Sequence, residues 1–251
     1  MVLLIVGLVL AVALLALPVA AAVLAQKKGA RVWKPLLWGA GAMAVASLLP
    51  AFYAILADAL AQGGTAAAAF FGGPWAAALS WVVMGVCFAG AITLALRVLF
   101  KAKANAFEAL LFGVGVCAPT LLYRGVIVAL TYLGGIGAGT DYASALVVTA
   151  TFTWVLLSTL TEAPLAVIAA YFVNGGKSLA GFALCAAAEI VALNASSIAE
   201  TLGLYDWITT LAGALILAGA VWMAARLWPR LPAPVPEKAK IQWPDREEEG
   251  R

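Results

Sequence analysis

Two glutamates stand inside long apolar stretches of this sequence, Glu162 in LTEAPLAV and Glu189 in CAAAEIVA. A charged side chain at the centre of a bilayer costs at least ~2.5–3.5 kcal/mol on insertion scales, so such residues are rare and usually face the interior of a helix bundle. Arg124 is a third charged residue in such a stretch. We expect a polar cavity in which two carboxylates hold a cation, relay a proton or pair with Arg124.

The spacing of these residues along their stretches predicts their depth. Glu162 and Glu189 each lie about 11 residues from the same membrane surface, which is roughly 16 Å at a rise of 1.5 Å per residue. Arg124 lies deeper, level with Asn194 and one turn from Thr120. Arg97 completes the expected polar intramembrane site, near the end of its helix, where its long side chain can reach the interface. The alternative is that these polar groups only hydrogen-bond between helices.

The composition predicts that lipid surrounds the helices that carry these residues. Hydrophobic residues make up 65% of the 251 residues and charged residues only 11%, against about 25% charged residues in soluble domains. The sequence contains no histidine, which excludes histidine-based zinc, haem and triad chemistry. Its three cysteines lie far apart in apolar stretches, so we interpret them as small core residues.

A bilayer core about 30 Å thick needs about 20 apolar residues per helix. We therefore predict an all-α, seven-helix transmembrane domain over residues 1–228, followed by a Pro-rich, charged cytoplasmic tail over 229–251. The first stretch lacks the basic start of a signal peptide, and we expect a retained helix. Gly113 and Gly115 predict close helix contact. The seven expected helices cover residues 2–25, 36–61, 75–100, 107–133, 145–173, 178–200 and 204–227.

The orientation follows from the basic residues, which gather in cytoplasmic loops. Among the connections, lysine and arginine occur in the first, third and fifth loops and after the last helix, whereas the second, fourth and sixth loops carry none. Seven helices with an outside N-terminus place all these residues in the cytoplasm, and we expect a multi-pass protein of the cell membrane. The residues are Lys27, Lys28, Arg31, Lys34, Lys101, Lys103, Lys177, Arg226 and Arg230.

Three short segments carry a resemblance to a known family. AGAITLALR is similar to an AG-x-x-E-E-x-x-R segment, FEALLFGVGVCAPT to A-L-x-x-G-x-G-H-G-x-x-E, and GFALCAAAEIVA to A-x-x-x-H-x-x-x-D. On these segments, and on the basic loop between its first two helices, the chain resembles the YhfC-type intramembrane metalloproteases, relatives of the CAAX-prenyl-protease-like membrane proteases. The resemblance implies their multi-helix fold.

The chain departs from this family at the catalytic positions. Thr93 and Leu94 stand where the family has paired glutamates, although Arg97 is kept, and Val116 and Thr120 replace a histidine and a glutamate. Cys185 and Glu189 replace the late histidine and aspartate, and Glu162 keeps only the acid of a Glu-Arg pair. Hydrolysis in this family needs a metal held by histidine and carboxylate. The resemblance therefore implies a non-catalytic relative without cofactors.

Three functional hypotheses follow. A non-catalytic relative would bind a transmembrane segment or act as an accessory subunit of another membrane protein. Alternatively, the chain is a carrier or channel for a small solute or ion that uses Glu162, Glu189 and Arg124. In the third hypothesis, a divergent enzyme holds a metal with Glu162, Glu189 and Cys185. A retinal protein is excluded because the last helix lacks a lysine, and nothing in the sequence indicates nucleic acid binding.

Overall fold

A computed structural model describes residues 2–27, 32–62, 74–138, 142–201 and 206–233. These residues form seven long α-helices and one short 3-10 helix, with no strand in the described ranges. The prediction of an all-α chain is confirmed. The helices are α1 (Val2–Lys27), α2 (Trp33–Ala61), α4 (Pro74–Val98), α5 (Ala106–Ala138), α6 (Tyr142–Asn174), α7 (Ser178–Thr201), α8 (Asp206–Leu227) and η1 (Trp228–Arg230).

Each observed helix corresponds to one predicted apolar stretch, and the largest difference is at the end of α5. The sequence predicts a loop from Gly134 onward, whereas α5 continues to Ala138 through three glycines. A helix satisfies every backbone hydrogen bond within its own segment, and this advantage outweighs the low helix propensity of glycine where water is scarce. Pro119 and Pro164 likewise lie inside α5 and α6 without ending them.

The surface of the helices is apolar, as expected for a protein in lipid. Along α2, the side chains of Leu48, Phe52 and Ile55 are 68%, 63% and 69% exposed, and exposed apolar faces this extensive are unusual in water-soluble monomers. Among the described residues, three helical segments are long and apolar enough to cross a bilayer: Trp33–Ala61, Ala106–Tyr123 and Leu211–Arg230. A span count of seven stays a prediction.

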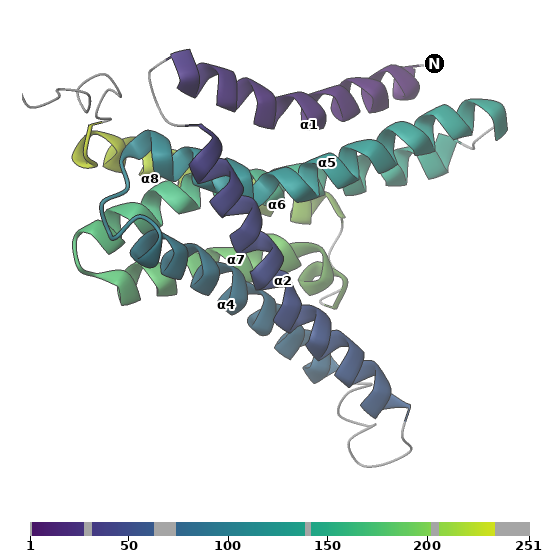
Figure 1. Cartoon of the computed structure of the whole chain (residues 1–251). Helices are drawn as coiled ribbons and strands as arrows, with labels where there is room; N and C mark the ends of the chain where they lie inside the picture. Colours follow the sequence, from purple (N-terminus) through teal and green to yellow (C-terminus); the bar gives the residue numbers. More distant parts are fainter. Residues whose placement is uncertain (1, 28–31, 63–73, 139–141, 202–205, 234–251) are drawn as a thin grey trace, which may run out of the picture.

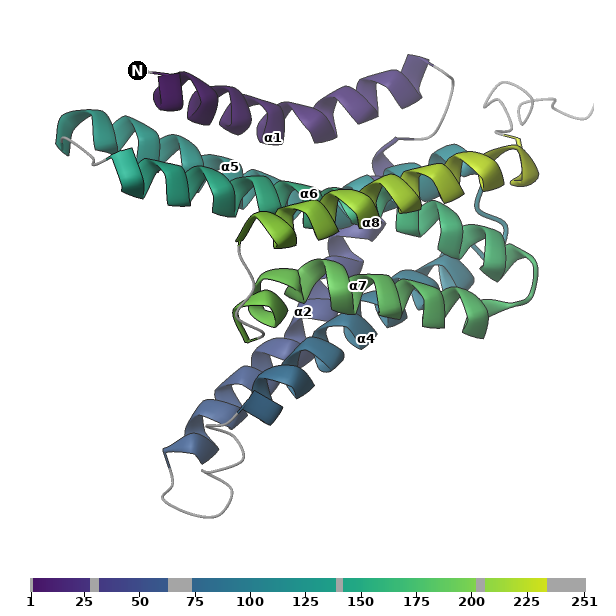
Figure 2. The ribbon, with the colours of Figure 1, turned by 180° about the vertical axis from the view of Figure 1, so that it is seen from behind.

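The helices form two hairpins that splay apart (Figure 1). The long α5–α6 hairpin and the α2–α4 pair converge at one end of the molecule, and their other halves diverge. Helix α7 packs against α4 and α6, α8 packs along α6, and α1 lies along α5 (Figure 2). The arrangement is therefore an open assembly with a shared core at one end, less compact than a parallel bundle.

All the described connections that carry lysine or arginine lie at this converging end. The end of α1, the start of α2, the α4–α5 connection, the α6–α7 turn and the end of α8 meet there in both views (Figures 1 and 2). We call it the basic end, after Lys27, Lys34, Lys101, Lys103, Lys177, Arg226 and Arg230.

The core lies between α4, α5, α6 and α7. Its largest buried side chains include Ile92, Leu96, Phe112, Leu165 and Ile168, each at most 1% exposed. These residues come from helices that are apolar on most sides, so burial is decided by which face meets a neighbouring helix.

Glycines set the distance between the helices of this core. A Cβ on Gly113 of α5 would lie 2.6 Å from Cα of Ala163 on α6, which leaves no room for it. A Cβ on Gly39 of α2 or on Gly115 of α5 would collide with the backbone of the facing helix. Small residues at crossings let helix backbones approach closely in membranes. The close packing predicted for Gly113 and Gly115 is confirmed.

Candidate functional site

Glu162 and Glu189 lie together in the core. Glu162 of α6 is 3% exposed and Glu189 of α7 is fully buried, and their carboxyl groups are close enough to interact directly. The two helices run antiparallel and pack against each other. The sequence predicts that the two residues lie at the same depth, and in the structure their carboxyl groups lie side by side.

This pair lacks hydrogen-bond donors. Within the described part of the chain, Oε2 of Glu162 and both carboxyl oxygens of Glu189 have no hydrogen-bond partner. Ionised carboxylates only accept hydrogen bonds, so two of them cannot satisfy each other. A proton shared between them would turn one group into a donor, and a cation between them would neutralise both. The geometry therefore fits a site for a proton or a small cation.

Two thiols border the carboxyl pair. Cys117 of α5 and Cys185 of α7 are 2% and 0% exposed, and both interact electrostatically with Glu162 and Glu189. The Cys117 thiol donates to the carbonyl oxygen of Thr159 at 3.0 Å, and the Cys185 thiol to that of Leu165 at 3.7 Å. Both thiols are thus directed at the α6 backbone.

Cys117 and Cys185 are core residues, as the sequence predicts, whereas Cys87 is only half-buried. The position of the two buried cysteines beside the glutamates is new. Sequence spacing gave no signal for it, because Cys117 and Glu162 lie 45 positions apart on different helices. The described residues contain no group of three histidine, cysteine, aspartate or glutamate side chains arranged to hold a metal ion.

The α6 backbone is irregular next to Glu162. Pro164 has no N–H, so the carbonyl oxygen of Leu160 loses its helical donor. One turn earlier, the Thr161 hydroxyl donates to the carbonyl oxygen of Leu157 at 2.9 Å. Carbonyls released in this way are common cation ligands in transporter helices. A carbonyl oxygen that lacks its helical donor and a carboxyl oxygen without a hydrogen-bond partner therefore occur within two residues of each other along α6.

A further unsatisfied group lies on α4. The side chain of Thr93 is 8% exposed, and its hydroxyl oxygen has no partner among the described residues. Helix α4 packs against both α6 and α7. Thr93 is thus a buried polar residue on a third helix of the core, at a position where the family resemblance implies only the loss of a glutamate.

The remaining predicted site residues lie elsewhere or cannot be placed. Thr120 is half-buried on α5, whereas Arg97 is exposed in the last turn of α4 at the basic end. The side chains of Arg124 and Asn194 lie outside the described residues. The structure thus brings together Glu162 and Glu189 and adds two cysteines to them.

An open apolar groove lies between α5, α6 and α8. It has a volume of about 660 Å³ and includes Leu110, Ala163, Pro164, Leu217 and Trp228 in its wall. Ala163 and Pro164 directly follow Glu162 in the sequence, so one segment of α6 contributes to both the groove and the carboxyl pair.

The chain matches no protein-family model, no curated protein and no solved structure with which it was compared.

Proposed function

We propose that this chain is a multi-pass membrane protein that binds a proton or a small cation between Glu162 and Glu189 and couples this binding to transport. The observation that supports the proposal most directly is the buried carboxyl pair, in which three of the four oxygens have no hydrogen-bond partner among the described residues. Ionisable residues inside membrane helices mark ion pathways and proton relays in pumps and carriers.

The proposed topology has seven spans, with the N-terminus outside and the basic end in the cytoplasm. It is supported by the gathering of the basic connections at one end of the molecule and by the positive-inside rule. Trp38 and Trp228 also lie near this end, where aromatic residues are enriched at membrane interfaces.

Transport requires that the pair becomes accessible in a second conformation. Pro164 interrupts the hydrogen bonding of α6 beside Glu162, and broken helices at binding sites are a recurring feature of carriers. The two hairpins diverge away from the basic end, so their outer halves lie apart from each other (Figure 1). We infer that movement of these halves opens the site.

The test is ion flux into liposomes that contain the purified full-length protein. A pH-sensitive dye and a cation-sensitive dye inside the vesicles report proton and monovalent cation movement under an imposed gradient. We expect flux from the natural protein and at least about a tenfold loss in Glu162→Gln and in Glu189→Gln, because the neutral amide neither holds a cation nor releases a proton.

Asp58→Asn provides the matched control. Asp58 is exposed on α2, and its replacement by asparagine removes the same single negative charge at a position away from the carboxyl pair. The flux of this variant should equal that of the natural protein. Flux that is unchanged in both glutamine variants would overturn the proposal.

A second candidate function is supported by the apolar groove. As an accessory subunit, the chain would bind a transmembrane segment of a partner between α5, α6 and α8. The groove there is open and lined by apolar side chains, which fit such a segment. The resemblance to the YhfC-type intramembrane metalloproteases, whose catalytic residues this chain lacks, supports the same function. Of the seven residues at that family's catalytic positions, five are buried, whereas Leu94 is 63% exposed and Thr120 is half-buried. The buried ones are Thr93, Val116, Glu162, Cys185 and Glu189.

A photo-crosslinking residue at Leu217 tests this candidate. Crosslinking in the native membrane should capture one protein at Leu217, whereas Leu48, which is exposed on α2, serves as the control position. Identical crosslinking to lipid at both positions would contradict the accessory function.

A further inference from the structure

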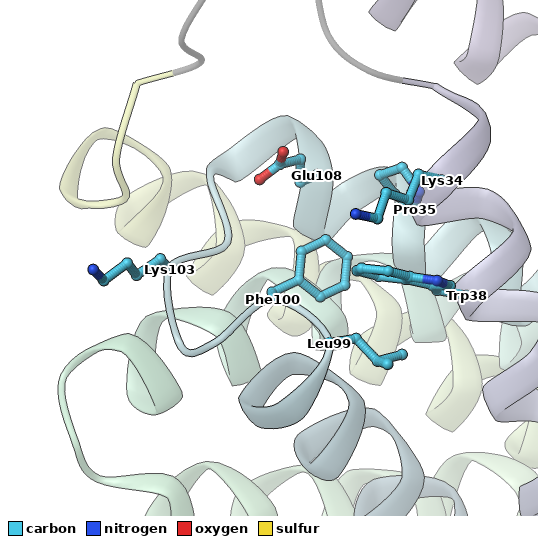
Figure 3. Close-up of a pocket in the computed structure, with 7 residues that line it drawn as sticks. All are labelled: Lys34, Pro35, Trp38, Leu99, Phe100, Lys103 and Glu108. Carbon is cyan, nitrogen blue, oxygen red and sulfur yellow. The ribbon is translucent and has the colours of Figure 1, made fainter.

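A small pocket opens at the basic end, separate from the carboxyl pair (Figure 3). It has a volume of about 200 Å³ and lies between the first turn of α2, the α4–α5 connection and the start of α5. The residues that determine its chemistry are Lys34 and Trp38 of α2, Phe100 and Lys103 of the connection, and Glu108 of α5.

Two aromatic rings form the floor of this pocket. The rings of Trp38 and Phe100 meet edge to face with their centroids 5.0 Å apart, and Phe100 packs in the same way on the buried Phe112. The pocket is therefore anchored to the core. Its amphipathic wall, with apolar rings below and charged groups above, matches the boundary between headgroups and acyl chains.

The two lysines stand on opposite sides of the pocket. The Lys34 ammonium lies over the Trp38 ring, 4.4 Å from its centroid, whereas Lys103 borders the pocket from the connection with its ammonium directed away from Lys34 (Figure 3). The connection is fixed in place, because Nδ2 of Asn174 donates to the carbonyl oxygen of Ala104 at 2.8 Å. Positive φ angles at Lys101 and Ala102 turn the chain there, which places the backbone of Lys103 beside the pocket.

One oxygen of the Glu108 carboxylate takes part in capping the start of α5. Its Oε2 accepts a hydrogen bond from the Asn105 N–H at 3.1 Å, and its own N–H donates to Oδ1 of Asn105 at 2.9 Å, which forms a reciprocal helix cap. With two lysines and one glutamate, the pocket keeps a net positive charge. The second oxygen of the Glu108 carboxylate remains available to accept a hydrogen bond from a hydroxyl group.

We propose that this pocket binds the headgroup of an anionic phospholipid, with the phosphate at the Lys34 ammonium and a headgroup hydroxyl on Glu108. The exposed Lys103 side chain turns toward the phosphate as its second partner. Basic pockets between helices at the cytoplasmic face suit such headgroups. Leu99, which also borders the pocket and is 39% exposed, continues its wall toward the acyl-chain region. A glycerol headgroup supplies both the single negative charge and the hydroxyl groups that this arrangement fits.

The test measures lipid binding to the purified full-length protein by native mass spectrometry. The probes are phosphatidylglycerol, phosphatidylcholine of the same acyl chains, and free glycerol phosphate, at about 0.5 M salt so that long-range attraction is screened. We expect phosphatidylglycerol to bind at least about fivefold more tightly than phosphatidylcholine, a preference typical of close lysine–phosphate contact.

The double variant Lys34→Gln/Lys103→Gln should lose this preference. The matched control is Lys27→Gln/Lys177→Gln, which removes two exposed lysines from the same end without touching the pocket, and it should keep the preference. If both double variants lose the preference for phosphatidylglycerol equally, the attraction is diffuse and electrostatic, and the proposed headgroup site is overturned. Free glycerol phosphate that binds as tightly as the lipid would overturn the assignment to a membrane lipid.

Discussion

Gly113 of α5 and Ala163 of α6 meet at a crossing that has no room for a further methyl group, since a Cβ on Gly113 would lie 2.6 Å from Cα of Ala163. Ala163 follows Glu162 in the chain, and the carbonyl oxygen of Glu162 would be 2.9 Å from the same Cβ. This crossing therefore fixes the position of one member of the carboxyl pair.

Gly113→Ala should lower the stability of the folded protein by about 1–3 kcal/mol, because the added methyl forces α5 away from α6. Gly41→Ala is the control, since a Cβ there meets nothing within 4 Å and alanine favours helix by up to about 1 kcal/mol over glycine. Thermal unfolding in detergent, followed by tryptophan fluorescence, measures both. Equal melting temperatures for the two variants would refute the tight crossing.

Glu189→Gln and Glu189→Ala should have opposite effects on stability. The glutamine amide can donate to the unpartnered Oε2 of Glu162, so we expect an equal or higher melting temperature. Alanine leaves a cavity beside a buried carboxyl group and should cost about 2–4 kcal/mol. If glutamine destabilises the protein as much as alanine does, the oxygens of the pair already have partners.

The two ends of the molecule should lie on opposite sides of the membrane. Single cysteines at Lys177 and Gln62, in a variant without the three natural cysteines, place one reporter at the basic end and one at the far end of α2. In intact cells, a membrane-impermeant maleimide should label Gln62→Cys and should label Lys177→Cys only after lysis. Labelling of both before lysis would contradict the proposed topology.

Asn105→Ala should destabilise the start of α5 by about 1 kcal/mol, because Asn105 caps this helix through both its side chain and its N–H. Asn105→Asp keeps the acceptor for the Glu108 N–H and should retain most of the stability. Hydrogen exchange at residues 106–110 measures the difference, and exchange that is identical in the alanine variant and the natural protein would remove the capping role.

The positions of the helices were predictable from the sequence, because each apolar stretch long enough to span lipid must satisfy its own backbone hydrogen bonds. The loop predicted from Gly134 was wrong for the same reason, since α5 continues to Ala138. The shared level of Glu162 and Glu189 followed from the rise per residue of an α-helix. Their direct contact did not, because it depends on how α6 and α7 are rotated about their own axes.

The sequence by itself thus determined the helices, their apolar surroundings and the presence of two acidic groups deep in them. Only the tertiary structure decided that these acids face each other, that Cys117 and Cys185 border them, and that the α2–α4 and α5–α6 hairpins diverge. The physical reason is that these helices are apolar on nearly every side, so no hydrophobic stripe selects the inward face. Close contacts at glycines such as Gly39, Gly113 and Gly115 make that selection instead.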